Sequence, residues 1–142
     1  MSPFADILQC RPSLTYSTMR NKILVCGLPG SGKTTYARAL ATSLGAVHFD
    51  ADEVRDSYPS RCGFSAADRR KHALHMKFLC DQVVKAGLTA VASFVCPTEE
   101  LRTLFGAHLV IWMDTVETSK YADTNSMWQP PIYYDLRIKQ WT

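Results

Sequence analysis

An eight-residue glycine-rich stretch, residues 27–34, constrains the fold of this chain more than any other feature. It reads GLPGSGKT and fits the pattern G-x-x-x-x-G-K-[S/T]. The apolar run Lys22–Cys26 precedes it, and small and apolar residues follow at helical spacing over Lys33–Leu44. Strand, glycine-rich turn and helix in this order predict a P-loop, in which backbone N–H groups and a helix N-terminus surround a phosphate.

The P-loop pattern predicts binding of a nucleoside triphosphate together with Mg²⁺. Lys33 is expected to reach the β- and γ-phosphates, the Thr34 hydroxyl to ligate Mg²⁺, and Thr35 to add an α-phosphate contact. The glycines keep the phosphate cradle open, since a bulky side chain would fill it. The predicted phosphate-binding residues are Gly27, Gly30, Ser31, Gly32, Lys33, Thr34 and Thr35.

Strand and helix patterns alternate along the rest of the chain. Apolar runs at residues 46–49, 88–94 and 108–113 predict strands, and residues 132–138 a last short one. A Ser65-x-x-Asp68 capping box predicts a long helix that stops at Gly87, with an apolar stripe formed by Leu74, Phe78, Leu79 and Val83. Because parallel strands need crossover connections, the predicted class is α/β: a three-layer P-loop NTPase fold, with a parallel sheet and helices on both faces.

The chain has the length of one domain, with 142 residues of which 46% are hydrophobic. Residues 1–18 show no clear period and are expected to be an N-terminal extension that is dispensable for chemistry, followed by a single P-loop kinase domain at residues 19–142. Residues 114–131 are polar and irregular and end in two prolines, which predicts a loop.

Composition argues against several other classes of protein. The net charge is +3 and the basic residues are scattered, so non-specific nucleic-acid binding is not expected. The five cysteines form no C-x-x-C pair, which argues against a disulfide framework or a zinc site and for reduced thiols in the cytoplasm. Polar residues interrupt every apolar run near the start of the sequence, so neither a signal peptide nor a membrane span is expected.

Two carboxylates, Asp50 and Asp52, follow the second predicted strand. In parallel sheets, ligands bind at the carboxyl ends of the strands. A carboxylate there can accept a proton from an attacking hydroxyl or hold Mg²⁺ through water. The alternative is a charged helix N-terminus, where the helix dipole favours acidic residues anyway. Beside a P-loop, we favour the functional interpretation.

A positively charged cluster, residues 61–72, surrounds the start of the predicted long helix. A guanidinium such as that of Arg69 pairs with phosphate or sulfate oxygens, and an aromatic ring such as Phe64 can stack on a base. The alternatives are a solvated helix face and a hydrophobic staple. We favour a functional role for Arg69 and a solvated face for Arg70 and Lys71.

Taken together, these motifs resemble the adenylylsulfate kinase family, whose members use ATP to phosphorylate the 3′-hydroxyl of adenosine 5′-phosphosulfate (APS). The P-loop GLPGSGKTT, the sequence DADEVR at residues 50–55, the complete G-F-S-x-x-D-R at residues 63–69 and SFVCP at residues 93–97 follow the family's order. The G-F-S-x-x-D-R motif is the most discriminating. The resemblance covers roughly residues 22–113 and fades beyond them.

The resemblance implies a role for each matching residue. Asp52 would be the base for the acceptor hydroxyl, Asp50 would support Mg²⁺ or that hydroxyl, and Lys33 would complete the catalytic set. Arg55 and Arg69 would bind the phosphosulfate. Phe64 would stack on the acceptor adenine, and Val95 and Cys96 would contribute backbone contacts. The implied acceptor-binding residues are therefore Arg55, Phe64, Arg69, His72, Val95 and Cys96.

The sequence departs from the family pattern at several positions. Ala51 replaces Gly, Cys96 replaces Ser, His72 stands where Asn is usual, and Thr98-Glu99 replaces Tyr-Arg. The family's basic lid over both nucleotides has only a reduced counterpart, residues 114–131, in which Lys120 is basic. A shortened lid could exclude water poorly or indicate a different acceptor.

The leading hypothesis from the sequence is an ATP-dependent, Mg²⁺-dependent kinase acting on a small nucleotide, with APS as the favoured acceptor. One alternative is a P-loop kinase of another nucleoside, nucleotide or polynucleotide 5′-hydroxyl. A second alternative, of another class, is a nucleotide-binding switch module that is not a kinase. A homodimer is left open as the assembly.

Overall fold

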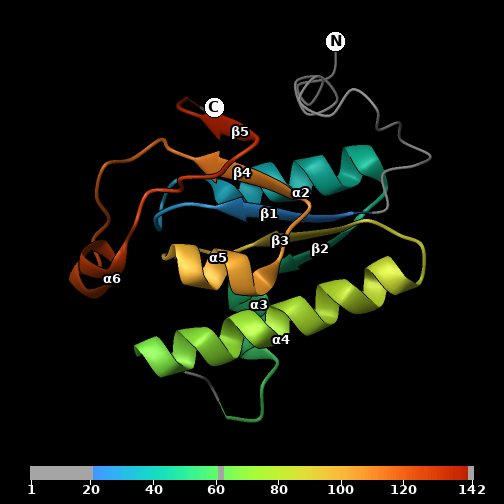
Figure 1. Cartoon of the computed structure of the whole chain (residues 1–142), viewed down its shortest axis with the longest axis horizontal. Coiled ribbons are helices and arrows are strands. Elements are labelled where there is room, and N and C mark those ends of the chain that lie inside the picture. Colours follow the sequence, from blue (N-terminus) through green and yellow to red (C-terminus); the bar gives the residue numbers. More distant parts are fainter. Residues whose placement is uncertain (1–20, 61–62, 141–142) are drawn as a thin grey trace.

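In a computed structural model, residues 21–60 and 63–140 are described. The expected extension at residues 1–18 lies outside the described residues, as do Cys10, Arg61 and Cys62. Five strands form one sheet in the order β2-β3-β1-β4-β5, and every neighbouring pair is parallel (Figure 1). The strands are β1 (Lys22–Cys26), β2 (Val47–Asp50), β3 (Ala90–Ser93), β4 (Leu109–Met113) and β5 (Leu136–Ile138).

Helices cover both faces of this sheet (Figure 1). The helices of the described residues are α2 (Lys33–Leu44), α3 (Ala51–Asp56), α4 (Ala66–Lys85), α5 (Glu99–Phe105) and α6 (Ala122–Met127), of which α6 contributes to neither core cluster. One core cluster joins α2 to one face of the sheet, and a second joins α3, α4 and α5 to the other. Burial on both faces explains why β1 is apolar after Lys22, its first residue. The predicted α/β class with a parallel sheet between helices is confirmed.

The register of the sheet determines which strand ends meet. Ser93 pairs with Val25 on one side and with Asp50 on the other. Since β1 leads into the P-loop and all three strands are parallel, their carboxyl ends bring Asp50 and Ser93 beside the P-loop. The sheet therefore assembles three polar segments that are far apart in the sequence.

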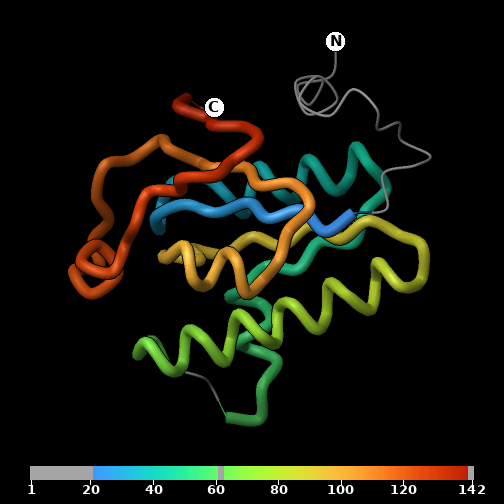
Figure 2. Tube along the Cα trace, viewed as in Figure 1, coloured from blue at the N-terminus to red at the C-terminus, as the bar shows by residue number. Residues whose placement is uncertain are grey.

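The helix content of residues 114–131 differs from the prediction. Figure 2 traces how the chain leaves β4, forms α6 and returns to set β5 beside β4. Helix α6 has six residues and no side-chain hydrogen bond at its N-cap, Tyr121. Hydrogen bonds to residues outside the helix stabilise α6. The Asn125 side chain exchanges hydrogen bonds with Ser119, and Arg69 donates to Thr124. Such contacts leave no pattern in the local sequence, so the prediction of a loop there was wrong.

Strand limits also shift by a few residues. Strand β2 begins at Val47 and includes Asp50, β3 covers only Ala90–Ser93, and β5 covers only Leu136–Ile138 of the predicted residues 132–138. The polar Asp50 ends β2 as a buried residue because its carboxylate accepts hydrogen bonds there.

The predicted start of α4 is confirmed, but only two residues of its predicted apolar stripe pack against the core. The Ser65 hydroxyl accepts a hydrogen bond from the Asp68 backbone N–H, as the capping box requires. Leu74 is 43% exposed and Phe78 58% exposed. Leu79 and Val83 are partly buried against the core. The fully buried face instead carries Arg69, His72, Ala73, Met76 and Cys80. The apolar members of this face belong to the core cluster between α4 and the sheet.

This assignment predicts unequal costs for two truncations on α4. Met76→Ala should lower the free energy of unfolding by about 2–5 kcal/mol, because it removes a buried side chain and leaves a cavity. Phe78→Ala should change it by about 0.5 kcal/mol or less, since that ring is mostly in water. Urea denaturation followed by circular dichroism measures both. Similar losses for the two variants would contradict the orientation of α4.

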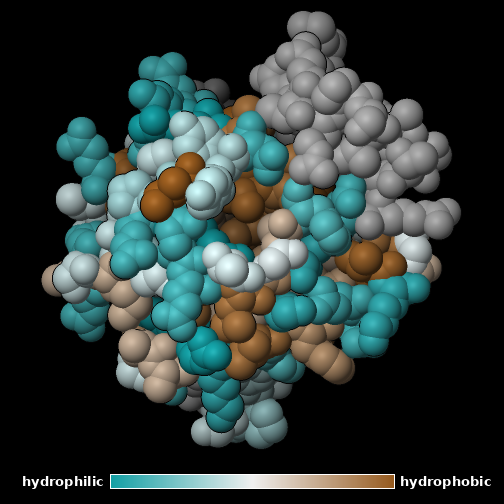
Figure 3. Space-filling model, in the orientation of Figure 1, coloured by the Kyte–Doolittle hydropathy of each residue, from teal (hydrophilic) through white to brown (hydrophobic). Residues whose placement is uncertain are grey.

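One face of the molecule is largely polar, and the described free cysteines are buried. Figure 3 shows hydrophilic residues over much of one face, with smaller apolar patches among them. Among the described residues, no helix combines the length and apolar character that crossing a membrane requires.

Cys26, Cys80 and Cys96 are free and buried. Burial raises the pKa of Cys26 and of Cys80 to about 12, and that of Cys96 well above its usual value, so these thiols stay protonated near neutral pH.

Candidate functional site

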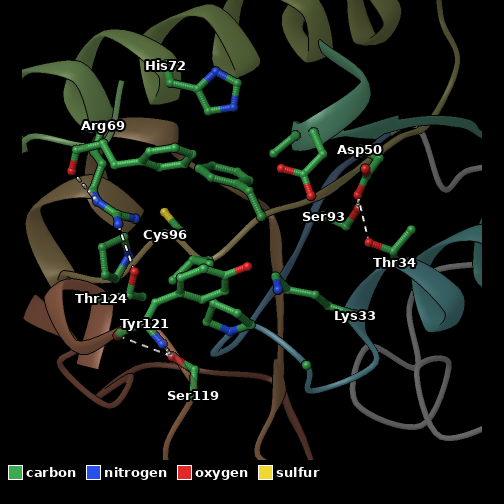
Figure 4. Close-up of a pocket in the computed structure, with 18 of the residues that line it drawn as sticks. Lys33, Thr34, Asp50, Arg69, His72, Ser93, Cys96, Ser119, Tyr121 and Thr124 are labelled. Carbon is green, nitrogen blue, oxygen red and sulfur yellow. Dashed lines mark hydrogen bonds between the residues drawn. The ribbon is translucent and has the colours of Figure 1, made fainter. Parts of the chain in front are cut away.

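A cavity of about 970 Å³ opens at the carboxyl edge of the sheet. Its walls come from the P-loop, the start of α3, the start of α4, the loop after β3 and the segment 114–131 (Figure 4). The predicted site residues that line it are Gly30, Gly32, Lys33, Thr34, Thr35, Asp50, Asp52, Arg55, Phe64, Arg69, His72, Val95 and Cys96. The fold thus brings together groups from most of the chain.

Gly27 and Ser31 do not line this cavity, and close packing explains why. A Cβ on Gly27 would lie 2.6 Å from the Met113 carbonyl oxygen and 2.8 Å from Ser31 Oγ. A glycine is therefore needed here because β4 approaches the chain. Ser31 is buried, and its carbonyl oxygen accepts a hydrogen bond from Thr115 Oγ1 at 2.7 Å. Both residues therefore pack the P-loop against the end of β4 and the residues that follow it, on the side away from the cavity.

Lys33 begins α2 and lines the cavity. Its Nζ donates to the Leu28 carbonyl oxygen at 3.4 Å, across the P-loop. Burial lowers the pKa of Lys33, and the nearby carboxylates of Asp52 and Asp50 oppose that shift. The ammonium group therefore lies over the glycine turn. Its hydrogen bond to Leu28 is long, and a phosphate oxygen can replace it.

A polar chain connects the P-loop helix to the second and third strands. Thr34 Oγ1 donates to Asp50 Oδ1 at 2.7 Å, and Ser93 Oγ donates to the same oxygen at 3.0 Å. His48 Nε2 lies 2.8 Å from Ser93 Oγ, and burial lowers the His48 pKa. Sequence reasoning missed Ser93, although a polar residue that ends a buried strand was a usable signal. The hydroxyl and the carboxylate are hard oxygen donors, which suit Mg²⁺.

Asp52 lies in the first turn of α3 and lines the cavity. Its side chain is 74% exposed, and Oδ1 lies 3.6 Å from Arg55 Nη1. Asp50 is buried and accepts hydrogen bonds from Thr34 and Ser93, whereas the Asp52 carboxylate is accessible to a ligand. The two carboxylates that the sequence singled out therefore occupy different environments at one edge of the sheet.

Two arginines share one aromatic ring. The guanidinium carbons of Arg55 and Arg69 lie 4.6 Å and 5.6 Å from the centre of the Phe64 ring, and both arginines are buried. Burial lowers the pKa of Arg69, and the positive charge of Arg55 lowers it further. Two like charges concentrated in a partly dry cavity favour an anion between them.

His72 lines the cavity and is uncharged near neutral pH. Its Nδ1 lies 3.1 Å from the Tyr58 hydroxyl, and its ring stands edge-on to Phe94. Burial lowers the His72 pKa to about 4, with Arg55 and His75 adding to the shift. Nε2 is buried and has no hydrogen-bond partner among the residues that the structure describes.

The loop after β3 is fixed by a buried arginine that sequence reasoning also missed. Arg102 Nη1 donates to the Cys96 carbonyl oxygen at 2.9 Å, and its Nη2 donates to the Gln129 carbonyl oxygen. Gln129 in turn donates its backbone N–H to Pro97 at 2.7 Å. Cys96 adopts a φ of 46°, which side-chain-bearing residues seldom do. These contacts join the loop to the end of residues 114–131.

Residues 114–131 contribute several side chains to the cavity, of which the sequence had singled out only Lys120. Ser119, Lys120, Tyr121, Asp123 and Thr124 all line it. In Figure 4, Tyr121 and Thr124 lie on the same side of the cavity as Arg69, whereas Lys33, Thr34 and Asp50 lie on the other. The cavity therefore has one side formed by the P-loop and a second side that carries Arg69 and Tyr121.

The family model of adenylylsulphate kinase matches residues 19–117, which include the P-loop, Asp50, Asp52 and Arg69 but not the cavity residues Tyr121 and Thr124. This chain belongs to the adenylylsulphate kinase family. The resemblance to this family that the sequence motifs indicated is confirmed. The match ends at residue 117, in the region where the resemblance was expected to fade.

Curated relatives agree with this membership. An adenylyl-sulfate kinase of Chloroflexus aurantiacus is 36% identical over 95 residues, which are 62% of this chain and 51% of that protein. An adenylyl-sulfate kinase of Vibrio vulnificus is 33% identical over 105 residues, 70% of this chain and 47% of that protein. The chain spans about half the length of the curated relatives it matches.

Solved structures of the family share this fold. A Mycobacterium tuberculosis APS kinase in complex with AMPPNP and APS has a TM-score of 0.72 and 22% sequence identity. The match covers 82% of this chain and 86% of that one. The P-loop NTPase architecture predicted from the sequence is thus confirmed, whereas the roles of single residues and the homodimer stay predictions.

Proposed function

We propose that this chain is an ATP-dependent kinase that phosphorylates the 3′-hydroxyl of APS and gives 3′-phosphoadenosine 5′-phosphosulfate. One observation carries the proposal: the guanidinium groups of Arg55 and Arg69 both lie near the half-exposed Phe64 ring in the cavity wall, and Arg69 lies across the cavity from Lys33 (Figure 4). An anion with an attached aromatic base fits that arrangement, because the guanidinium groups bind the anion and the ring stacks on the base. The domain at residues 19–142 would carry this activity.

On the donor side, backbone N–H groups of the P-loop would surround the ATP phosphates, and Lys33 would neutralise charge on the β- and γ-phosphates. Thr34 and Asp50 have the hard oxygens that fit Mg²⁺, with Asp50 acting directly or through water. When bound, Mg²⁺ would supply positive charge that stabilises the transferred phosphoryl group. Ser93 would hold Asp50 in position through its hydrogen bond.

On the acceptor side, Asp52 would take the proton of the 3′-hydroxyl or orient it toward the γ-phosphate. Its exposed carboxylate supports this role, because an acceptor must approach it closely. Backbone groups of Val95 and Cys96, in the loop that Arg102 fixes, would contact the acceptor nucleotide. Much of the rate enhancement would come from positioning and charge stabilisation.

A second acceptor class is favoured by one feature of the cavity. Asp123 lines it, and its negative charge raises the pKa of Arg69 against the other influences on that group. A carboxylate near the proposed anion site favours an acceptor with less negative charge than APS. The alternative proposal is therefore a P-loop kinase of another acceptor. Among the nucleoside, nucleotide and polynucleotide 5′-hydroxyl acceptors, the Asp123 carboxylate favours the uncharged nucleoside.

The proposal predicts a contrast between two neighbouring arginines. Arg69→Ala should raise the KM for APS by roughly 10- to 100-fold, because charge-assisted hydrogen bonds contribute about 1.5–3 kcal/mol. Arg70→Ala should change it less than about threefold, since Arg70 is half exposed and forms a surface ion pair with Glu100.

The assay supplies Mg²⁺ and ATP with or without APS and detects the 3′-phosphorylated product directly. The KM for ATP should be similar in both variants. ATP turnover with nucleosides or polynucleotide ends, but not with APS, would replace APS by the alternative acceptors. Binding of ATP without transfer to any acceptor would favour a switch module and reject the kinase proposal.

A further inference from the structure

The six-residue helix α6 touches the acceptor side of the cavity through one buried hydrogen bond. Arg69 Nη2 donates to Thr124 Oγ1 at 2.8 Å (Figure 4). Arg69 is 7% exposed and Thr124 is 4% exposed. The contact joins the first turn of α4 to a segment 55 residues away, and water does not screen it.

This bond helps to fix the plane of the Arg69 guanidinium. Nε of the same group donates to the Phe64 carbonyl oxygen at 2.9 Å, so two different nitrogens are held by two separate segments. A guanidinium is rigid and planar, and fixing two of its nitrogens sets the direction of the remaining N–H groups. Those groups can then bind an anion without further loss of side-chain entropy.

Helix α6 in turn depends on contacts outside itself. A helix of six residues is too short to be stable alone in water, and its N-cap makes no side-chain hydrogen bond. The ends of the surrounding segment are tied elsewhere, since Thr115 donates to Ser31 and Gln129 donates to Pro97. Thr124 lies between these two anchors and faces the cavity. The position of α6 and the orientation of Arg69 are therefore linked.

We propose that Thr124 is a positioning residue for the acceptor: it accepts the Arg69 hydrogen bond, and so couples docking of α6 to the binding of an acceptor anion. The inference rests on the proposed function, because it assigns the anion to Arg69. Loss of the hydroxyl leaves a buried, charged N–H without a partner, which is costly and releases the guanidinium from its plane. By thermodynamic linkage, an acceptor that prefers the held Arg69 must also stabilise docked α6 by the same factor.

The test compares Thr124→Val, which keeps the shape but removes the hydroxyl, with Thr124→Ser, which keeps the hydroxyl. Thr124→Val should weaken APS binding roughly tenfold and raise its KM by a similar factor, with the KM for ATP unchanged. Thr124→Ser should stay within about threefold of the wild type. Ser126→Ala, an exposed change on the same helix, is the matched control. Titration calorimetry measures the affinity, and the product assay measures both KM values.

Hydrogen exchange of the full chain without any nucleotide tests the coupling itself. Thr124→Val and Arg69→Lys should both speed exchange of the backbone amides in residues 122–127, and Thr124→Ser should not. APS should slow the exchange of these amides in the wild type but much less in Thr124→Val. Wild-type affinity and wild-type exchange in Thr124→Val would overturn the inference. If the wild type bound no APS, the proposed function would fail, while the contrast between valine and serine would still decide whether Thr124 holds α6 to Arg69.

Discussion

Replacing Lys33 by methionine is expected to lower kcat by about 10³-fold. Methionine has a similar length but carries no charge, so the variant loses the cation that lies over the P-loop. Negative charge shifts toward the bridging oxygen as the γ-phosphoryl group leaves, and a positioned cation stabilises that change. Removing one such group in a water-poor site costs on the order of 10²–10³ in rate. The measurement is initial velocity with saturating ATP, Mg²⁺ and APS.

Two checks separate this effect from a folding defect. Lys33 is only partly buried and begins α2, so the variant should keep the circular dichroism spectrum and unfolding midpoint of the wild type. Arg38→Met, on the outer face of the same helix, removes a cation of similar length and should leave turnover unchanged. Turnover of Lys33→Met above a tenth of the wild-type value would show that another cation supports the transfer.

Replacing Asp52 by asparagine is expected to lower kcat by about 10²–10⁴-fold with little change in either KM. Asparagine keeps the size of the side chain and still suits the first turn of α3, but it cannot accept a proton. The carboxylate is largely exposed to the cavity, so its removal should disturb no core contact. Steady-state kinetics at several acceptor concentrations separate kcat from KM.

Two further variants distinguish the proton acceptor from the candidate Mg²⁺ ligand. Glu53→Gln removes the same charge one residue along α3, at a side chain that does not line the main cavity, and should leave kcat unchanged. Asp50→Asn should instead raise the Mg²⁺ concentration needed for half-maximal rate, because Asp50 holds Thr34 and is the candidate oxygen ligand. Near-normal turnover of Asp52→Asn, together with a large loss in Asp50→Asn, would assign the proton acceptor to Asp50.

Local patterns in the sequence located the P-loop and most of the cavity wall that it forms. The P-loop, the strand before it and the helix after it are contiguous, so the residues predicted to surround a phosphate are neighbours in the chain. The Ser65 cap is a hydrogen bond between residues three positions apart, which the sequence can show directly. The family motifs located Arg55, Phe64 and Arg69 in the same way, and the fold class followed from alternating strands and helices.

The tertiary structure alone decided which long-range partners those residues meet. The sequence contains more than one apolar stripe on α4, and packing against the sheet chose the face with Met76 rather than the one with Phe78. Ser93 reaches Asp50 only because β2 and β3 pair in one register. Thr124 meets Arg69 across 55 residues, in a helix too short to be predicted from its own sequence. Periodicity and capping report local free energies, whereas these contacts depend on how distant segments pack.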